Sequence, residues 1–402
     1  MSDARAPAGA HLVLVGAGVM GAGYLDAAAR LGVPVRLADF AASAERSRAQ
    51  AEHVVAVDSP LDEAWFAGAL RALDARRPAG VVAFSEPHVL AAALLQDAFA
   101  LPGPGLRAAT VSRNKALQRA VFAAAGVPQP EHLLTASLHE ASAWVRARFP
   151  VVVKPLSGAG SEGVELVPDA AAFAAAVARR GGEGKLLVER AVEGPEFSCE
   201  CLVRETRILF TNVTAKETTG PPRFVETCHR PGHAFGSRAQ CDAVEAFTRD
   251  VVGALGMRTG IVHLEFRLAE EGPVLMEVAV RTPGDYLMDV VSLTCGIDLF
   301  EAVLRLALAL PLPRAGTAPV QYAASRFFLP APGRVTAVRG LDDVRAHPAV
   351  LRCVVKLQPG DVVRRPESSM DRAGHVLVRG RTPLERDQAL RFVDDTLVIE
   401  TA

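Results

Sequence analysis

A β-hairpin is predicted by Ile261-Val-His-Leu-Glu-Phe-Arg-Leu268, the turn Ala269-Glu-Glu-Gly-Pro273 and the run Pro273-Val-Leu-Met-Glu-Val-Ala-Val-Arg281. Both runs alternate apolar and polar residues, which is typical of strands with one buried face. With a turn centred on Glu271, every residue on one face of the hairpin is apolar. That face carries Val262, Leu264, Phe266, Leu268, Val274, Met276, Val278 and Val280. We therefore expect it to pack against the core, and the polar residues, His263 among them, to gather on the opposite face.

The polar face carries two carboxylates in opposed positions. The same register pairs Glu265 with Glu277 and Arg267 with Leu275. Directly opposed carboxylates repel and destabilise a sheet, and a cation between them reverses the sign of that interaction. Mg²⁺ prefers oxygen ligands and is commonly held by carboxylates together with substrate phosphates. Glu265 and Glu277 therefore predict a Mg²⁺ site, with Mn²⁺ as the alternative ion, and Arg281 on the same face is suited to hold a phosphate or carboxylate. The competing interpretation is a solvated sheet face with incidental charges.

Composition limits the class of protein. At 402 residues the chain is long enough for two or three domains. Lys plus Arg (44) nearly balances Asp plus Glu (45), giving a net charge of −1, so we expect neither a nucleic-acid nor a membrane partner. The long apolar stretch 299–312 contains Glu301 and Arg305 and is too short to span a bilayer. Six irregularly spaced Cys favour reduced thiols and a cytoplasmic location, and Cys199 and Cys201 are expected to share a strand face without forming a zinc site.

Three blocks follow one another along the chain. Residues 1–108 alternate short apolar runs with helical stretches, which predicts a Rossmann-like parallel sheet covered on both faces. The expected strands are His11–Val15, Val33–Ala38, His53–Val57 and Gly80–Ser85. Residues 109–312 form the second block, which begins with a helix that we expect Ser112 to cap. Residues 313–402 are rich in strand and turn signals and predict a β-rich C-terminal subdomain.

An ordered set of motifs in the middle block resembles the ATP-grasp superfamily of ligases. The set consists of Ser112-Arg-Asn-Lys115, Phe149-Pro-Val-Val-Val-Lys154-Pro, Gly158-Ala-Gly-Ser-Glu-Gly163, Leu187-Val-Glu-Arg-Ala-Val-Glu-Gly-Pro-Glu196 and the hairpin. The resemblance covers roughly residues 110–310, and its specificity lies in the order of the motifs rather than in any single one. No Gly-x-x-x-x-Gly-Lys-Ser/Thr sequence occurs, so a P-loop does not account for nucleotide binding.

The resemblance implies a fold and a nucleotide site. The implied fold is α/β, with a Rossmann-like N-terminal domain, an ATP-grasp domain and a β-rich C-terminal subdomain. The positive charges of Lys115 and Lys154 would face the phosphates of ATP. Backbone N–H groups of the glycine-rich loop would approach the same phosphates closely. Glu189 and the backbone from Arg190 to Val192 would read the adenine edge. The implied loop and ribose residues are Gly158, Gly160, Ser161 and Gly163 for the phosphates and Glu196 for the ribose.

Within the superfamily the chain is most similar to bacterial L-amino-acid ligases, with carnosine-synthase-like enzymes as close relatives. This resemblance implies an ADP-forming carboxylate–amine ligase that works through an acyl phosphate, with amino acids as expected substrates and a homodimer as the expected state. Glu226 and His229 would hold the amino-acid substrate. Arg281 and the backbone at Gly284 would stabilise the acyl phosphate and the tetrahedral species formed from it. The chain departs from the family pattern at Ala279, where a ligating Asn is usual, and this puts a second metal ion in doubt.

Other functions stay open on the sequence. Gly16-Ala-Gly18-Val-Met-Gly21, followed by Asp39 at the end of the next strand, fits a dinucleotide fingerprint and favours an NAD-dependent dehydrogenase. A glycine-rich turn of this kind also occurs in ATP-grasp enzymes that bind no dinucleotide there. The Ala279 departure keeps a non-catalytic ATP-binding regulator open. A ligase or carboxylase acting on a nucleotide precursor or a biotin carrier would share the middle block.

Overall fold

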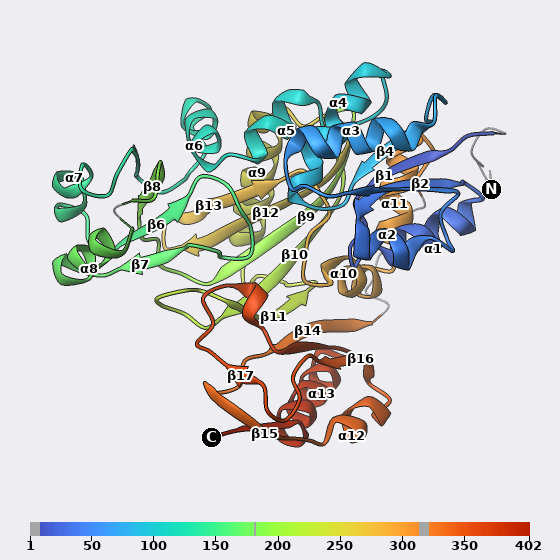
Figure 1. Cartoon of the computed structure of the whole chain (residues 1–402). Coiled ribbons are helices and arrows are strands. Elements are labelled where there is room, and N and C mark those ends of the chain that lie inside the picture. Colours follow the sequence, from blue (N-terminus) through green and yellow to red (C-terminus); the bar gives the residue numbers. More distant parts are fainter. Residues whose placement is uncertain (1–8, 181, 313–320) are drawn as a thin grey trace.

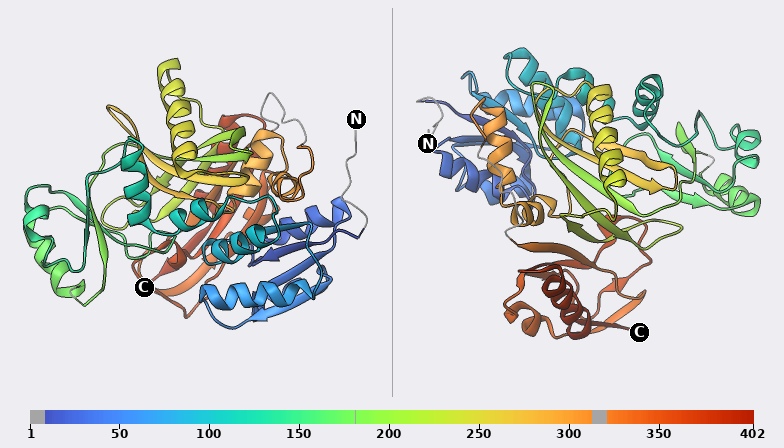
Figure 2. Two further views of the ribbon diagram at one scale, coloured as in Figure 1. Left: turned by 90° about the horizontal axis from the view of Figure 1, so that it is seen from above. Right: turned by 180° about the vertical axis from the view of Figure 1, so that it is seen from behind.

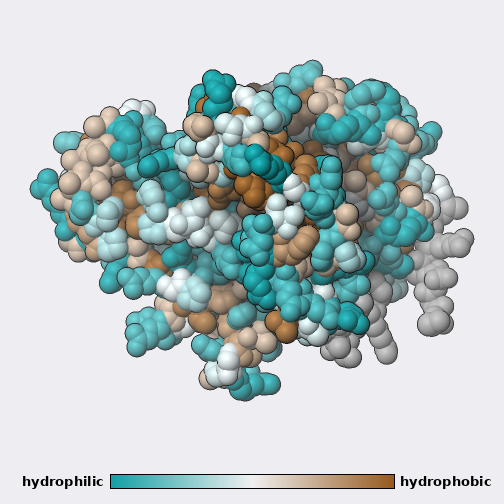
Figure 3. Space-filling model, turned by 90° about the horizontal axis from the view of Figure 1, so that it is seen from below, coloured by the Kyte–Doolittle hydropathy of each residue, from teal (hydrophilic) through white to brown (hydrophobic). Residues whose placement is uncertain are grey.

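The computed structural model describes residues 9–180, 182–312 and 321–402. Three lobes surround one large sheet: the N-terminal block, a smaller lobe built from residues near 130–190, and the C-terminal block (Figure 1). Figure 2 shows the same lobes from above and from behind. Within the described ranges, no helix combines the length and apolar character needed to cross a membrane. Polar residues cover most of the face drawn in Figure 3, and apolar residues show mainly toward its middle.

The N-terminal block contains the predicted parallel sheet. Its strand order is β3-β2-β1-β4, and all three pairings are parallel. The strands are β1 (Leu12–Val15), β2 (Val35–Phe40), β3 (His53–Val57) and β4 (Gly80–Ala83). The helices of this block are α1 (Ala22–Leu31), α2 (Ala41–Ser47), α3 (Asp62–Leu73), η1 (Glu86–His88) and α4 (Val89–Ala98). Helices α3 and α4 pack on one face around the buried Trp65. On the other face α1 packs with α11 (Leu299–Ala307), so the middle block completes the core of the first.

The large sheet has eight strands in the order β13-β12-β9-β10-β11-β14-β18-β16, and every pairing is antiparallel. The strands are β9 (Glu196–Arg204), β10 (Arg207–Thr218), β11 (Glu226–Pro231), β12 (Gly260–Ala269), β13 (Gly272–Ala279), β14 (Tyr322–Phe328), β16 (Val350–Val355) and β18 (Gly374–Gly380). The helices around it are α5 (Leu106–Ser112), α6 (Lys115–Ala124), α9 (Arg238–Leu255) and α10 (Leu287–Cys295). Residues of α9 pack against the apolar face of β9 and β12, where Cys199 and Cys201 are buried side by side. The pairing of β11 with β14 makes the middle and C-terminal blocks parts of one sheet.

The smaller lobe is a four-stranded antiparallel sheet in the order β5-β8-β6-β7. Its strands are β5 (His132–Thr135), β6 (Val151–Pro155), β7 (Glu165–Val167) and β8 (Leu186–Arg190), and its helices are α7 (Ser142–Arg146) and α8 (Ala170–Arg180). Apolar residues of β6 and β8 pack with Phe173 of α8 in a core of their own. The lobe therefore has its own hydrophobic centre and presents the opposite face of its sheet to the rest of the molecule.

The C-terminal block is rich in strands, as predicted, and also contains two helices that the sequence reading missed. Beside β14, β16 and β18 it holds a three-stranded sheet in the order β17-β15-β19. The remaining elements are β15 (Gly333–Arg339), β17 (Val362–Val363), β19 (Val398–Thr401), α12 (Leu341–Ala346), η2 (Ser369–Asp371) and α13 (Pro383–Thr396). The start of α13 has recognisable signals, because Thr382 caps it, Pro383 opens it and the backbone N–H of Glu385 donates to the Thr382 hydroxyl at 3.1 Å.

The predicted cap of α6 is wrong. The helix begins at Lys115, and the Asn114 side chain accepts from the backbone N–H groups of Ala116 and Leu117. Ser112 instead ends α5, where its hydroxyl donates to the carbonyl of Ala109 at 3.0 Å. Both residue types favour the N-cap, so the sequence alone could not choose between positions two residues apart.

The glycine-rich turn after β1 is occupied by a side chain of the protein itself. Oδ2 of Asp39 accepts from the backbone N–H groups of Ala17 and Gly18 at 3.0 and 3.1 Å. A Cβ on Gly16, whose φ is +75°, would lie 1.9 Å from the ring of His88, so that ring packs directly on the turn. The amides that would hold a pyrophosphate in a dinucleotide site are therefore bound to Asp39. This geometry disfavours the dehydrogenase interpretation.

Asp39→Ala tests this structural role. The change leaves the N–H groups of Ala17, Gly18 and Phe40 without their carboxylate acceptor, and we expect it to lower the free energy of unfolding by about 3 kcal/mol. Chemical denaturation measures the loss, with the exposed Asp58→Ala as the control. Saturating NAD should leave the melting temperature of the wild type unchanged. A clear rise with NAD, or an Asp39→Ala protein as stable as the control, would contradict the assignment.

Candidate active site

A cavity of about 430 Å³ lies between the sheet of the smaller lobe and the β12–β13 end of the large sheet. This volume is in the range of sites for small molecules. The cavity brings together most of the residues singled out in the sequence: Lys115, Lys154, Gly158, Gly160, Ser161, Glu189, Arg190, Val192, Glu196, Glu226, Glu265, Glu277 and Arg281. They come from α6, the smaller lobe, β9, β11 and the hairpin, so several segments far apart in sequence build one site.

Three predicted site residues do not line this cavity. The carbonyl of Gly163 accepts from Nη1 of Arg180 at 2.9 Å and fixes the end of the glycine-rich loop. His229 is buried in β11, and its Nε2 lies 3.0 Å from Oδ2 of Asp285. The carbonyl of Gly284 accepts from the N–H of Leu287 at the start of α10. The substrate-binding role of His229 and the catalytic role of Gly284 stay predictions.

The hairpin carries Glu265 opposite Glu277, as predicted, and its register then shifts. Phe266 pairs with Leu275, which leaves Met276 as the extra residue of a β-bulge. The predicted pairing of Arg267 with Leu275 and the predicted core positions of Val274 and Met276 are therefore wrong. A bulge redirects the side chain at the extra position. Leu275 takes the buried place, and Met276 lines the cavity.

Each of the opposed carboxylates faces an ammonium group. Nζ of Lys115 lies 3.1 Å from Glu277, and Nζ of Lys216 lies 2.6 Å from Glu265. Among the described residues no cluster of three His, Cys, Asp or Glu side chains could hold a metal ion by itself. Two opposed carboxylates in one cavity could give two ligands to a Mg²⁺ ion that takes its remaining ligands from phosphates and water.

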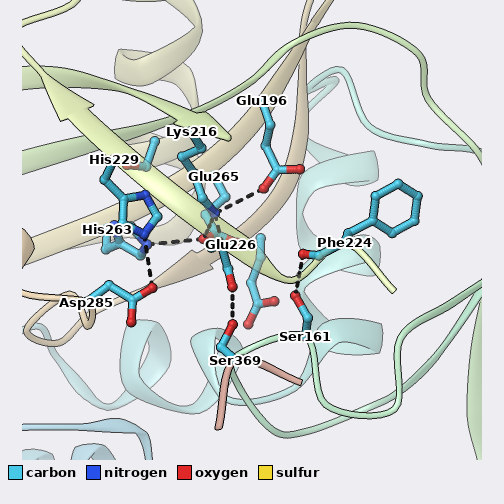
Figure 4. Close-up of polar contacts among 12 residues, drawn as sticks. Ser161, Glu196, Lys216, Phe224, Glu226, His229, His263, Glu265, Asp285 and Ser369 are labelled. Carbon is cyan, nitrogen blue, oxygen red and sulfur yellow. Dashed lines mark hydrogen bonds and ion pairs between the residues drawn. The ribbon is translucent and has the colours of Figure 1, made fainter. Parts of the chain in front are cut away.

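Lys216 is the site residue that sequence reasoning missed most clearly. Its ammonium group lies 3.0 Å from Glu196, 3.5 Å from Glu226 and 2.6 Å from Glu265 (Figure 4). Burial would lower the pKa of Lys216, but the three carboxylates outweigh it and raise the pKa well above its ordinary value. Lys216 lies near the end of β10, and its three partners come from three other strands, so the local sequence carries no signal for this role.

A buried histidine also contacts Glu265. Nε2 of His263 lies 3.3 Å from Glu265, and Nδ1 lies 3.1 Å from Glu200, which is fully buried. Burial would lower the pKa of His263, but the hydrogen bonds and charges of these two carboxylates raise it. Glu200 in turn accepts from the hydroxyl of Ser198 and the amide of Asn212, each at 2.7 Å. The polar floor below Glu265 is therefore fully connected by hydrogen bonds.

Glu189 is held by two buried cations. Its carboxylate lies 2.5 Å from Nε of Arg119 and 2.7 Å from Nζ of Lys154. Burial would raise the pKa of Glu189, but these two charges and their hydrogen bonds lower it to about 2. Arg119 was missed by the sequence reading, although it lies four residues after Lys115 on α6 and so faces the same side of that helix. The pair fixes Lys154 in the cavity wall, and the adenine role of Glu189 stays a prediction.

The segment after β8 forms the far end of the cavity. Arg267 joins it to the hairpin, because Nη1 donates to the carbonyl of Val192 at 3.0 Å and Nη2 lies 3.1 Å from Glu196. The N–H groups of Arg190 and Ala191 donate to backbone carbonyls of Glu131 and Pro150. In the part of the chain that the structure describes, the N–H of Val192 has no backbone acceptor, and Val192 lines the cavity. A donor in this position suits the edge of a purine ring.

The glycine-rich loop has a backbone that requires its glycines. Gly158, Gly160 and Gly163 have φ values of +112°, +68° and +68°, which L side chains rarely adopt. Nζ of Lys115 donates to the carbonyl of Gly158 at 3.1 Å, and the hydroxyl of Ser161 donates to the carbonyl of Phe224 at 3.2 Å. The loop thus lies across the cavity between α6 and the turn before β11.

The other end of the site contains two further ion pairs, Arg281 with Glu86 and Arg372 with Asp285. Nε of Arg281 lies 3.3 Å from Glu86, and Arg281 lines the cavity. Nη1 of Arg372, from the C-terminal block, donates to Oδ2 of Asp285 at 2.8 Å, and His229 contacts the same oxygen. Burial would raise the pKa of Asp285, but the hydrogen bonds from Arg372 and His229 hold it well below its ordinary range. Asp285 and Arg372 were not predicted, because their partners are far away in sequence.

Comparisons with known proteins show which families the chain resembles. Residues 147–289 match a family model described as the ATP-grasp domain, and residues 326–402 match one described as L-amino acid ligase C-terminal domain 2. The chain is 30% identical over 370 residues to an uncharacterized protein, y4rH, of Sinorhizobium fredii, which covers 89% of this chain and 76% of that protein. It is 23% identical over 306 residues to the L-arginine-specific L-amino acid ligase of Bacillus subtilis, which covers 72% of each.

A solved structure shares the fold over nearly the whole chain. The crystal structure of an L-amino acid ligase from Bacillus licheniformis matches with a TM-score of 0.84 and 21% identity. The match covers 98% of this chain and 100% of that one. The likeness includes the N-terminal sheet and the C-terminal block as well as the middle block.

Arg119→Met tests the buried charge cluster around Glu189. Removing one cation leaves a buried carboxylate with a single partner, so we expect the free energy of unfolding to fall by about 3 kcal/mol at neutral pH. The matched control is Arg238→Met, which removes a 2.8 Å ion pair on the exposed surface of α9 and should cost less than about 1 kcal/mol.

The effect of Arg119→Met should depend on pH. Because the pKa of Glu189 is lowered from 4.5 to about 2 in the folded protein, the stabilisation is present above pH 4.5 and is lost as the pH falls toward 2. Denaturation curves should therefore show the difference between wild type and variant shrinking over that range. A difference that stays constant with pH would contradict the assignment.

Proposed function

This chain belongs to the ATP-grasp superfamily of carboxylate–amine ligases, and we propose that it joins two amino acids in an amide bond at the expense of ATP. The observation that supports this most is the pair Glu265–Glu277 on one sheet face, in a cavity closed by a glycine-rich loop and bordered by lysines. Phosphoryl transfer requires this kind of arrangement, because its catalysis consists mostly of positioning and charge compensation.

The nucleotide is proposed to lie between the smaller lobe and the hairpin. The N–H of Val192 and the apolar Met276 suit an adenine ring, and Glu196, held by Lys216 and Arg267, suits the ribose hydroxyls. The loop from Gly158 to Gly163 covers the phosphates, and Lys115 and Lys154 compensate their charge.

Glu265 and Glu277 are proposed to hold Mg²⁺, with Mn²⁺ as the alternative. The fit rests on the structure, because the two carboxylates are paired across β12 and β13 and both line the cavity. A bound divalent ion would supply charge neutralisation at the phosphates. Lys115, whose Nζ lies 3.1 Å from Glu277, would then be available to a phosphate oxygen. Ala279 offers no further ligand, so we expect the two glutamates to be the protein's contribution.

The chain's own residues position the reacting groups. Arg281 is oriented by Glu86 and faces the cavity, where it suits a substrate carboxylate or the acyl phosphate formed from it. Glu226 lines the same cavity, and its carboxylate suits the ammonium group of an amino acid. Attack of the carboxylate on the γ-phosphorus releases ADP, and attack of an amine on the acyl phosphate then gives an amide and phosphate. The closed loop excludes water, which would otherwise hydrolyse that intermediate.

Amino acids are proposed as the substrate class for two reasons. The C-terminal block matches a domain described for L-amino acid ligases, and one relative is named an L-arginine-specific L-amino acid ligase. Glu226 and Arg281 also line the same cavity, and their opposite charges suit the two charged groups of an amino acid. The cytoplasmic location and the homodimer stay predictions, and size-exclusion chromatography with light scattering tests the latter.

The function is tested by measuring ADP and phosphate release with Mg²⁺ and ATP over amino acids, singly and in pairs, with mass spectrometry of the products. Release that requires a pair and yields a mass equal to their sum less water is the expected result. ATP binding without product for any pair would favour a non-catalytic ATP-binding protein.

Glu277→Ala tests the metal site. We expect turnover to fall at least about a thousandfold, because the change removes one of two metal carboxylates. The fold should stay intact, as judged by circular dichroism and melting temperature. Glu271→Ala, in the exposed turn of the same hairpin, is the matched control and should keep wild-type turnover. Ligase activity retained in Glu277→Ala would refute the metal role.

A further inference from the structure

A short turn of the C-terminal block reaches the active site. We call residues 368–372 the serine turn; it contains η2 and lies between β17 and β18. Ser368 caps η2 with extended backbone (φ −152°, ψ 170°), and Asp371 accepts from the backbone N–H groups of Glu367 and Ser368 at 2.9 Å each. These internal bonds give the turn a defined shape before any contact with the rest of the site.

Ser369 contacts two different parts of the site. Its backbone N–H donates to the carbonyl of Gly160 in the glycine-rich loop at 2.9 Å. Its hydroxyl donates to Oε2 of Glu226 (Figure 4). The other oxygen of Glu226 faces Lys216 at 3.5 Å, so this carboxylate is held from two opposite sides. Ser369 is buried, and both contacts are shielded from solvent.

Arg372 fixes the serine turn to the floor of the site. Its Nε donates to the carbonyl of Ser369 at 2.7 Å, and its guanidinium makes a two-pronged contact with Asp285. The guanidinium also lies 3.7 Å above the ring of Phe327 on β14. Asp285 is the residue after Gly284 and contacts His229, so the turn is tied to the same strand, β11, that carries Glu226. The position of Ser369 relative to Glu226 is therefore fixed independently of the loop.

We infer that Ser369 is a positioning residue that orients Glu226 for the ammonium group of the substrate and docks the glycine-rich loop through its backbone. The inference rests on the proposed substrate role of Glu226. Ser369 then connects the glycine-rich loop over the phosphates with the carboxylate of Glu226. Closure of the loop and orientation of Glu226 support each other, because both use Ser369. The loop thereby closes over ATP in a site where the Glu226 carboxylate is already oriented for the amino acid.

Side-chain variants test the first half of the inference. Ser369→Ala removes the hydroxyl but keeps the backbone N–H, and we expect the KM for the amino acid bound by Glu226 to rise about tenfold. The KM for ATP should stay near that of the wild type. Ser369→Thr keeps a hydroxyl and should restore most of the loss. Met370→Ala is the matched control within the turn, since this side chain is 79% exposed. Ser369→Ala with the kinetics of the control would overturn the orienting role.

A proline variant tests the second half. Ser369 is the first residue of η2 and follows an extended residue, a position that accommodates proline. Ser369→Pro removes the N–H and places Cδ against the carbonyl of Gly160. Hydrogen exchange of residues 157–163, followed by mass spectrometry, reports docking of the loop. We expect ATP to slow this exchange in the wild type, Ser369→Ala and Met370→Ala, but not in Ser369→Pro. Equal slowing in Ser369→Pro would overturn the docking role.

The two proposals fail in distinguishable ways. A wild type that ligates no pair of amino acids refutes the proposed function, whereas the exchange experiment needs only ATP and still decides the docking role. Melting temperatures of all variants establish that they are folded. As a test without any substitution, the amino acid alone should slow exchange of residues 157–163 in the wild type. Unchanged exchange there would overturn the coupling.

Discussion

The opposition of Glu265 and Glu277 across β12 and β13 is the electrostatic constraint on which the site depends. Two carboxylates at paired positions of a sheet require positive charge nearby. The protein supplies it with Lys115 and Lys216, at 3.1 and 2.6 Å. A divalent cation can take over this compensation when phosphates arrive with it. The ligand-free site thus compensates its own carboxylates, and we propose that Lys115 contacts phosphate oxygens when ATP and a divalent cation bind.

The buried charges below the cavity show the same compensation of carboxylates by nearby cations. Lys216 contacts three carboxylates that we assign to ribose, substrate and metal, and His263 links Glu265 to the buried Glu200. A buried ion network of this kind adds little to stability, because desolvation offsets most of the attraction. Its effect is to fix geometry. The ammonium group of Lys216 holds Glu196, Glu226 and Glu265 in fixed positions, and these are the side chains that we propose to contact ATP, the amino acid and the metal ion.

The continuity of the large sheet explains why the C-terminal block takes part in the site. β11 pairs with β10 on one side and with β14 on the other. Glu226 and His229 therefore lie on a strand that borders the C-terminal block directly, and the serine turn reaches them without a long connection. Ser369, the residue proposed to orient Glu226, therefore comes from a block whose sequence shows no catalytic motif.

The sequence predicted what depends on local patterns. Alternation along the hairpin predicted the opposition of Glu265 and Glu277, and turn and strand signals predicted β1 to β4 and the β-rich C-terminal block. Three consecutive apolar residues, from Val274 to Met276, concealed the bulge, because either Leu275 or Met276 could take the core position. Lys216, Arg372 and Ser369 were missed for a different reason. Their roles arise from contacts between distant strands, and a single serine or lysine in a strand or loop gives no sign of its partners.

The most direct test of the account follows an oxygen atom. An amino acid substrate labelled with ¹⁸O in its carboxylate is incubated with the enzyme, Mg²⁺, ATP and the second amino acid, and the released phosphate is examined by mass spectrometry. If the carboxylate attacks the γ-phosphorus, one carboxylate oxygen leaves with the phosphate when the amide forms. The account predicts phosphate that carries one ¹⁸O per amide bond. Unlabelled phosphate released together with the amide product would contradict an acyl-phosphate mechanism at this site.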